Sequence, residues 1–226
     1  VRFRSVKNVI NEITKWNKEL GVSKFVFRDP VFSIKRAYTV ELCEALIKLE
    51  FKIEFLIETH LANLDNELID LLYKAGLKFI YVGIESVDEK VLNNMKRHTT
   101  NKDFQYNTIT KLEKKGIIVK SMFMLGNPED DEVSMMNTIK YSLLLPNKFV
   151  QFSVFTPYPG TPVFKDFENR ITTTKMENFN QYNLVFKHEY IDNKILNKFK
   201  HLAYRNFYLN FKNLGTLTKS LLSIFK

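Results

Sequence analysis

Polar side chains that could bind a ligand or move a proton come directly after several apolar segments of this chain. Asp29, Glu58 and Glu85 supply carboxylates at three such points, and His60 supplies an imidazole at one of them. Carboxylates placed in this way could attract a cationic or amine-bearing ligand, or could act as general acids and bases. Either chemistry requires a fold in which these segments end side by side.

The position of Glu85 favours a function more than that of the other three. It directly follows a strand-like run, where a carboxylate is costly unless it meets a partner or solvent. Its neighbour Ser86 begins the Ser-x-x-Glu pattern of a helix capping box, so a structural role explains that hydroxyl equally well. Asp29 precedes Pro30 and could be a turn residue. The four histidines show no pairing at metal-ligand spacing, and we predict no metal ligand in this chain.

The stretch from Gly116 to Glu132 shows most clearly how such a segment ends. Seven of the nine residues after Gly116 are apolar, which predicts a strand buried on both faces. Gly126 permits a tight turn, and we expect Asn127 to cap a helix that begins at Pro128. The acidic residues that follow suit the positive end of a helix. The stretch therefore predicts a strand, a sharp turn and a helix start.

The same unit recurs along the chain. Strand-like segments begin near residues 24, 52, 78, 117 and 149, with helical patterns before the first and between each pair. This alternation predicts right-handed βαβ units and a parallel sheet, as either an open doubly wound sheet or a closed or partial barrel. In both folds ligands bind at the carboxyl ends of the strands. The glycine motifs of dinucleotide sites and phosphate loops are both missing from the sequence.

The composition of the chain limits the remaining choices. The 226 residues contain one cysteine, which excludes an internal disulfide and a cluster held by cysteines of this chain alone. Cys43 falls on the apolar side of a predicted helix, so we expect it in the core. No run is apolar enough to span a membrane and no signal peptide is present, which predicts a cytoplasmic protein. The chain opens at Val1 without methionine, which suggests a fragment whose natural N-terminus lies upstream.

The C-terminal part differs from the rest in its charge. Residues 187–226 hold eight Lys and Arg against two acidic residues, within a formal charge of +9 for the whole chain. An aromatic helical stripe from Asp192 to about Leu214 is followed by a short amphipathic end. A basic helix of this kind predicts packing on the main body, with peripheral membrane contact as the second choice. We expect no nucleic-acid binding by the main body.

The residues at the strand ends, taken in order, resemble the core of radical S-adenosylmethionine (radical SAM) enzymes. The resemblance covers about Ser5 to Gly160 and depends on three motifs and one looser match. The motifs are Phe27-Arg28-Asp29-Pro30-Val31-Phe32, Tyr81-Val82-Gly83-Ile84-Glu85-Ser86 and Thr156-Pro157-Tyr158-Pro159-Gly160-Thr161-Pro162. The looser match is to the family pattern G-x-I-x-G-x-x-E: Gly126 and Glu129 fit, while Met122 and Met124 replace the first glycine and the isoleucine.

The resemblance implies an α/β fold, a partial (β/α) barrel of parallel strands with an α-helical C-terminal extension. We place the barrel at residues 1–165, without its first strand and cysteine loop, and the basic helical extension at residues 166–226. The segment from Ala203 to Leu209 looks like the extension found in the cobalamin-dependent subgroup. That subgroup places a cobalamin-binding domain before the barrel.

The resemblance also implies a role for each matching position. The turn that contains Arg28 and Asp29 would receive the amino group of S-adenosylmethionine. Glu85 and Ser86 would reach its ribose or methionine part. Adenine would lie against main chain around Met124 and Gly126 and against the segment from Gln151 to Thr156. Glu58 and His60 would face the substrate, and no catalytic residue is assigned.

In this family a [4Fe-4S] cluster cleaves S-adenosylmethionine to a 5′-deoxyadenosyl radical, for chemistry such as methyl transfer or rearrangement. The cluster is held by a C-x-x-x-C-x-x-C loop, which this sequence lacks. As supplied, the chain is therefore expected not to assemble the cluster or turn over. The resemblance further implies a reductant such as ferredoxin or flavodoxin, a small-molecule or lipid-like substrate, and cobalamin in the parent protein.

Two other functions fit the same residues. One is a non-catalytic α/β barrel remnant that binds a nucleotide-like ligand or a partner protein. The other is a conventional barrel enzyme that uses Asp29, Glu58 and Glu85 as acid and base groups.

Overall fold

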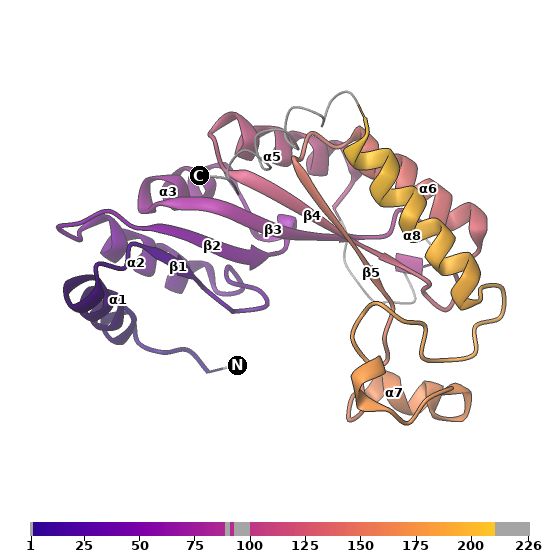
Figure 1. The fold of residues 1–226 in the computed structure, drawn as a ribbon. Helices are drawn as coiled ribbons and strands as arrows, with labels where there is room; N and C mark the ends of the chain where they lie inside the picture. Colours follow the sequence, from indigo (N-terminus) through magenta and orange to yellow (C-terminus); the bar gives the residue numbers. More distant parts are fainter. Residues whose placement is uncertain (1, 89–90, 93–99, 211–226) are drawn as a thin grey trace. The chain divides into compact units, whose positions relative to one another are not determined.

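The fold is an α/β partial barrel in which five parallel strands alternate with helices (Figure 1). The computed structural model describes residues 2–88, 91–92 and 100–210. The predicted helix that follows Ser86 and the end of the basic tail fall mostly outside these residues. The strands are β1 (Lys24–Val26), β2 (Glu54–Thr59), β3 (Leu77–Glu85), β4 (Ile118–Leu125) and β5 (Phe149–Val154).

The five strands follow one another in the sheet in their sequence order, β1-β2-β3-β4-β5. The pairs β1–β2 and β2–β3 are parallel, with Val26 opposite Leu56 and Glu58 opposite Tyr81. Each strand begins within about two residues of its predicted position, and the predicted parallel sheet is confirmed. The sequence left open a doubly wound open sheet and a closed or partial barrel, and the structure is the partial barrel.

Capping interactions explain where several helices begin and end. Their bounds are α1 (Val6–Leu20), α2 (Arg36–Ile47), α3 (Asn66–Ala75), α5 (Lys102–Lys114), α6 (Glu132–Leu144), α7 (Pro162–Phe167) and α8 (Asn193–Tyr208). Side chains of Ser5, Asp65 and Asp192 cap three of them by accepting backbone N–H groups. Gly21 and Gly76 end α1 and α3 in the left-handed conformation that glycine adopts most easily.

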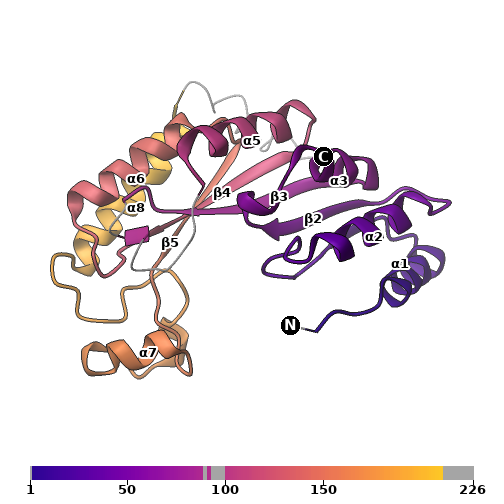
Figure 2. The same ribbon diagram turned by 180° about the vertical axis from the view of Figure 1, so that it is seen from behind.

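The chain divides into two compact units. The first comprises Val1–Gly83 with Thr100–Lys120, and the second comprises Ile84–Thr99 with Ser121–Lys226. In the first unit α2 packs against α1 and α3, and Figure 2 shows all three on the same face of β1 and β2. Its core includes Ile57, Leu72 and the fully buried Cys43. The predicted core position of Cys43 is confirmed.

Aromatic side chains fill the core of the second unit. Phe123 of β4 stacks on Phe152 of β5, with their ring centroids 5.4 Å apart. The hydroxyl of Tyr204 accepts the N–H of Phe152 at 3.0 Å, and that of Tyr208 accepts the N–H of Val150 at 3.4 Å. Two tyrosines of α8 thus supply hydrogen bonds to the backbone of β5. Figure 1 shows the ribbons of these two elements.

The structure corrects one expectation about β4. The apolar run predicts burial on both faces, but burial alternates: Phe123 and Leu125 are buried, whereas Lys120, Met122 and Met124 are half-buried. Successive side chains of a strand point to opposite faces, so only one face of β4 is fully covered.

The start of α6 is a second correction. The helix begins at Glu132, and its N-cap is Asp131 in a capping box with Ser134, whereas the sequence predicted Asn127 as the cap. Asn127 is instead buried, and both its backbone N–H and its side-chain amide donate to Asp130. Because the Asp130 carboxylate accepts these two donors, the turn extends by four residues before the helix starts.

Within the described residues, the structure contains no helix with the length and apolar character needed to cross a membrane.

Gly76 and Gly21 allow a test of how tightly α3 packs against the start of β2. A Cβ at Gly76 would lie 2.1 Å from the backbone oxygen of Ile53, whereas a Cβ at Gly21 would meet nothing within 4 Å. Both residues have a positive φ. We expect Gly21→Ala to lower the free energy of unfolding by about 1 kcal/mol and Gly76→Ala to lower it by more than about 3 kcal/mol. Urea denaturation measures both, and equal losses would show that the contact with Ile53 costs nothing.

Candidate functional site

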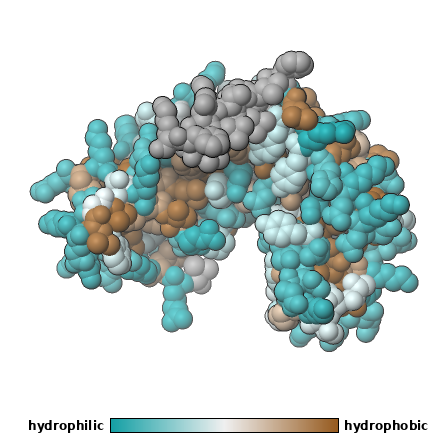
Figure 3. Space-filling view, viewed as in Figure 1, coloured by the Kyte–Doolittle hydropathy of each residue, from teal (hydrophilic) through white to brown (hydrophobic). Residues whose placement is uncertain are grey.

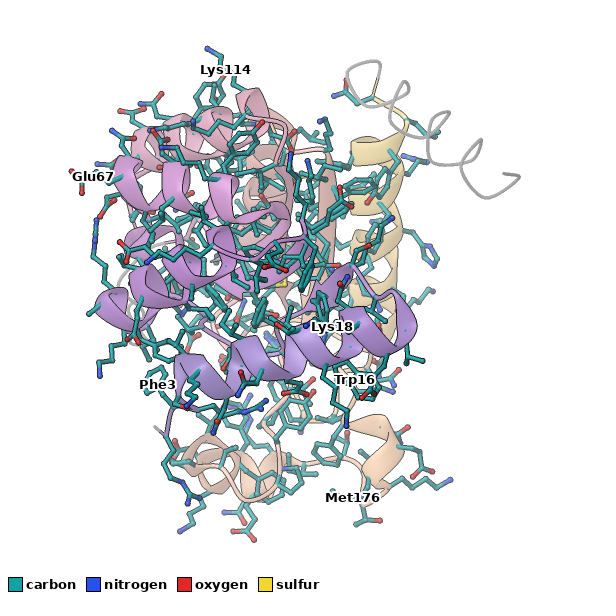
Figure 4. All side chains as sticks on the ribbon, turned by 90° about the vertical axis from the view of Figure 1, so that its left-hand side faces the viewer. Phe3, Trp16, Lys18, Glu67, Lys114 and Met176 are labelled. Atoms are coloured by element: carbon teal, nitrogen blue, oxygen red, sulfur yellow. The ribbon has the colours of Figure 1, made fainter. Side chains whose placement is uncertain are left out.

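The turn after β1 lines a cavity of about 610 Å³ in the first unit. Arg28 and Asp29 are exposed at its wall, together with aromatic residues that include Trp16, Phe27 and Tyr38. Figure 4 shows Trp16 and Phe3, another wall residue, near the two ends of α1. Burial and the charge of Asp29 both raise the pKa of the Tyr38 hydroxyl. Asp29 and the aromatic rings could bind an amine or another organic cation at this part of the wall, which elsewhere holds Arg2 and Arg4.

The end of β2 is tied to the turn after β1. The N–H of Phe32 donates to the carbonyl oxygen of Glu58 at 2.9 Å, and the hydroxyls of Ser33 and Thr59 are hydrogen-bonded to each other. Glu58 is half-buried, whereas His60 is exposed at the start of a short 3₁₀ turn, Leu61–Asn63. The predicted proximity of these two strand ends is thus present in the structure.

A cation that the sequence reasoning missed lies beside Glu58. The Nζ of Lys120, on β4, lies 3.6 Å from the centroid of the Tyr81 ring on β3. Tyr81 is in register with Glu58. Burial lowers the pKa of the Lys120 ammonium, and the charge of Glu58 opposes this effect. A lysine on the alternate face of an otherwise apolar strand is the sequence signal that could have identified it.

In the second unit, the end of β3 holds Glu85 in an unusual backbone conformation. Its φ is 70°, in the left-handed region, which costs a residue other than glycine about 1 kcal/mol. Backbone strain of this kind occurs most often at functional sites. The adjacent Ser86 is buried, and its hydroxyl accepts the N–H of Asp88 and lies 3.4 Å from the hydroxyl of Thr138 on α6. The capping role that the sequence left open for Ser86 therefore has support.

The end of β4 makes a similar left-handed turn at Gly126, where φ is 71°. A Cβ on this residue would lie 3.3 Å from the side chain of Leu196, so the turn packs closely on α8. The N–H of Phe155 donates to the carbonyl oxygen of Leu125 at 3.0 Å, which joins the ends of β4 and β5. Met124 is half-buried beside this pair.

The predicted residues of β5 have local hydrogen bonds. The Gln151 amide donates to the hydroxyl of Ser153 at 3.2 Å, and the Thr156 hydroxyl donates to the carbonyl oxygen of Val154 at 3.0 Å. Both residues are half-buried. Met124, Gly126 and Thr156 thus lie at or beside the joined ends of β4 and β5, whereas Gln151 lies within β5.

A buried polar network that the sequence did not reveal holds the turn after Gly126. Asp130 accepts hydrogen bonds from Asn127 and, at 2.6 Å, from the hydroxyl of Ser134. Burial raises the pKa of Asp130, and these hydrogen bonds oppose the shift. The Nδ1 of His188 accepts two backbone N–H groups, so its Nε2 donates to the carbonyl oxygen of Asn127 at 2.7 Å. Sequence spacing could not identify this pair, which is 61 residues apart.

The residues of this chain do not fit an iron–sulfur cluster. Within the described residues, no group of three or more His, Cys, Asp and Glu side chains is placed to hold a metal ion. Cys43 is fully buried, and burial raises the pKa of its thiol to about 12. One buried thiol cannot replace the three cysteines of the family's cluster loop.

Two curated proteins are similar to this chain over most of its length. The bacteriochlorophyllide d C-12(1)-methyltransferase of Chlorobaculum tepidum is 26% identical, over 82% of this chain and 41% of its own length. An anaerobic magnesium-protoporphyrin IX monomethyl ester cyclase of Rubrivivax gelatinosus is 25% identical, over 92% of this chain and 38% of its own. The chain thus spans about two fifths of the length of these two relatives.

A solved structure shares the fold. The radical S-adenosylmethionine methyltransferase TsrM of Kitasatospora setae, with cobalamin and a [4Fe-4S] cluster bound, superposes with a TM-score of 0.67 at 17% identity. The superposition covers 74% of this chain and 34% of that protein. The family model described as "Radical SAM superfamily" matches residues 1–141. Since this match covers more than half of the 226 residues, the chain belongs to the radical SAM superfamily.

Proposed function

We propose that this chain is the part of a radical SAM enzyme that binds S-adenosylmethionine and faces the substrate. The observation that supports this proposal most directly is the left-handed backbone of Glu85 at the end of β3. No local turn chemistry requires a glutamate there, since glycine would adopt the same φ without strain. A carboxylate kept in a strained position at the ligand-binding end of a parallel sheet is well explained by contact with a ligand.

Each part of S-adenosylmethionine has a suitable partner in this proposal. The cavity wall at Arg28 and Asp29 receives the amino group, because a carboxylate beside aromatic rings favours an organic cation. Glu85, with Ser86 next to it, binds the ribose or methionine part. Main-chain groups near Gly126 and along the segment from Gln151 to Thr156 bind the adenine edge.

The reaction that we propose is radical chemistry at an unactivated carbon, such as methyl transfer or rearrangement. In this family the cluster and S-adenosylmethionine together supply the radical. The one cysteine of this sequence is buried, so the cluster ligands of the working enzyme come from outside residues 1–226. The names of the two relatives describe a methyltransferase and a cyclase, which supports this reaction class. Glu58 and His60 face the substrate in this assignment.

The remaining assignments are proposals of the same kind. The working enzyme uses a reductant such as ferredoxin or flavodoxin and acts in the cytoplasm. The parent protein binds cobalamin, since the similar TsrM structure holds this cofactor. The barrel comprises residues 1–165 and the basic extension residues 166–226, which includes α8. In this proposal the same extension makes peripheral contact with a membrane.

Substitutions at Glu85 test the proposal because they separate its charge from its backbone strain. In the complete gene product, reconstituted with iron and sulfide, we expect Glu85→Gly to stabilise the fold by about 1 kcal/mol, or about 2–4 °C in melting temperature. The same variant loses the carboxylate, so its affinity for S-adenosylmethionine should fall by about tenfold or more, a loss of about 1.4 kcal/mol. Calorimetric titration measures the affinity, and thermal unfolding measures the stability.

Glu54→Ala is the matched control, because Glu54 is a strand glutamate at the opposite, amino end of β2. It should leave the affinity for S-adenosylmethionine unchanged. If Glu85→Gly binds S-adenosylmethionine as tightly as the wild type, Glu85 has no part in the cofactor site. If the affinity falls without a gain in stability, the backbone strain is not the sign of function that we propose.

Cys43 provides an independent test. Because burial raises the pKa of its thiol to about 12, we expect almost no reaction with a thiol reagent at pH 8 in the folded 226-residue chain. In urea the ordinary thiol pKa returns, and one thiol per chain should react. In the complete gene product, Cys43→Ala should leave the iron content of the reconstituted protein unchanged. Loss of iron in this variant would make Cys43 a cluster ligand and contradict the assignment.

A further inference from the structure

His188 joins the extension (residues 166–226) to the turn after β4. Its side chain is buried, and its ring lies beside that of Phe186, with the two centroids 5.7 Å apart. The Nδ1 atom accepts the N–H groups of Tyr190 and Ile191 at 3.1 and 3.2 Å, so Nε2 carries the proton. Nε2 donates to the carbonyl oxygen of Asn127 at 2.7 Å. Nδ1 thus holds the backbone of the extension itself, while Nε2 holds the turn.

The turn itself contains a buried polar group that stability does not explain. The backbone N–H and the side-chain amide nitrogen of Asn127 both donate to the Asp130 carboxylate, at 2.8 and 2.9 Å. The Oδ1 atom of Asn127 is buried and has no hydrogen-bond partner among the described residues. A buried acceptor without a partner lowers the stability of a fold. A requirement for one fixed backbone conformation explains this polar turn better than stability does.

The extension also contacts the ends of both β4 and β5. The N–H of Val154, the last residue of β5, donates to the carbonyl oxygen of Gln181 at 2.7 Å. At the end of β4, a Cβ on Gly126 would lie 3.3 Å from the side chain of Leu196 and 3.9 Å from that of Leu184. Leu196 belongs to the buried face of α8, and Figure 3 shows hydrophilic residues over the exposed side of this helix. The extension therefore holds the main chain at both strand ends.

We propose that His188 is a positioning residue for the adenine site and acts through the carbonyl oxygen of Asn127. The inference rests on the proposed function, in which main chain near Gly126 and from Gln151 to Thr156 binds the adenine edge. Main-chain groups recognise such an edge best when they are already in place, because a loose turn must be ordered as the ligand binds. The hydrogen bond from His188 supplies this order before binding, and with it selectivity for adenine over a purine with a different edge.

Two substitutions that each keep one ring nitrogen separate positioning from stability. In His188→Gln the amide nitrogen takes the place of Nε2 and can still donate to Asn127. In His188→Asn the amide oxygen takes the place of Nδ1 and can still accept the N–H groups of Tyr190 and Ile191. His188→Gln gives up two hydrogen bonds and His188→Asn gives up one. We therefore expect His188→Gln to lower the melting temperature at least as much as His188→Asn does.

Adenosine and inosine are the probes, because they share the ribose and differ in the edge of the base. In calorimetric titrations of the complete gene product, reconstituted with iron and sulfide, we expect adenosine to bind at least about tenfold more tightly than inosine. His188→Asn should lose this preference through a fall of about tenfold or more in the affinity for adenosine, whereas His188→Gln should retain it. His201→Asn is the matched control, because His201 is exposed on α8. It should change neither affinity.

Affinities that simply follow stability contradict the inference. If His188→Gln loses the adenosine preference as His188→Asn does, or if His188→Asn retains it, His188 only stabilises the fold. The titration of Glu85→Gly with S-adenosylmethionine keeps this failure separate from that of the proposed function. If Glu85→Gly lowers the affinity for S-adenosylmethionine but His188→Asn leaves the adenosine preference unchanged, the inference alone is wrong. If the wild type does not distinguish the two nucleosides, both the adenine site and its positioning by His188 are wrong.

Discussion

The alternation of side chains along each strand is the constraint on which the rest of this structure depends. In β2, β4 and β5, and in β3 from Ile80 onward, every second side chain is buried, and the intervening ones are less covered. The buried set builds the core, including Ile57, Ile80 and Phe123. The other set includes polar groups such as Glu58 and Lys120. The two-residue period thus gives each strand one set of side chains for the core and a second set for binding.

The carboxyl ends of the strands are held by different means. The turn after β4 depends on the buried Asp130, which organises Asn127 and Ser134, and on His188 from a distant segment. The end of β3 contains a strained glutamate instead of a glycine. Buried hydrogen bonds of this kind favour a single conformation of the turn. Folding alone does not require a precise turn beside a strained carboxylate, whereas the binding of a ligand does.

Membership of the radical SAM superfamily and the absence of cluster ligands from this sequence are compatible. The family match covers residues 1–141, and the single cysteine is a core residue of α2. The chain supplies the sheet and its carboxyl-end residues, while the cluster would be held elsewhere in the working enzyme. In the proposed function, the described residues bind and orient S-adenosylmethionine and the substrate, tasks that depend on cavity shape, charge and backbone edges.

The sequence by itself determined the features that depend on near neighbours. Strand positions, the start of the C-terminal helix next to Asp192 and the burial of Cys43 all follow from patterns within about ten residues. Local patterns also identified the polar strand ends, and motifs in register identified the family. The predicted start of α6 was wrong, because the Asn127 side chain donates to Asp130 instead of accepting a backbone N–H, and Asp131 caps the helix.

Only the tertiary structure decided the contacts between residues far apart in the chain. The ring of Tyr81 under Lys120, the hydrogen bond from His188 to Asn127 and the pairing of Tyr204 with β5 each join different elements. Such contacts leave no periodic trace, because any aromatic or polar residue on the correct face could supply them. The left-handed backbone of Glu85 is similarly invisible in the sequence, since local propensity favours glycine at that φ. The binding proposals depend on these features, because a binding site forms where the ends of separate strands lie together.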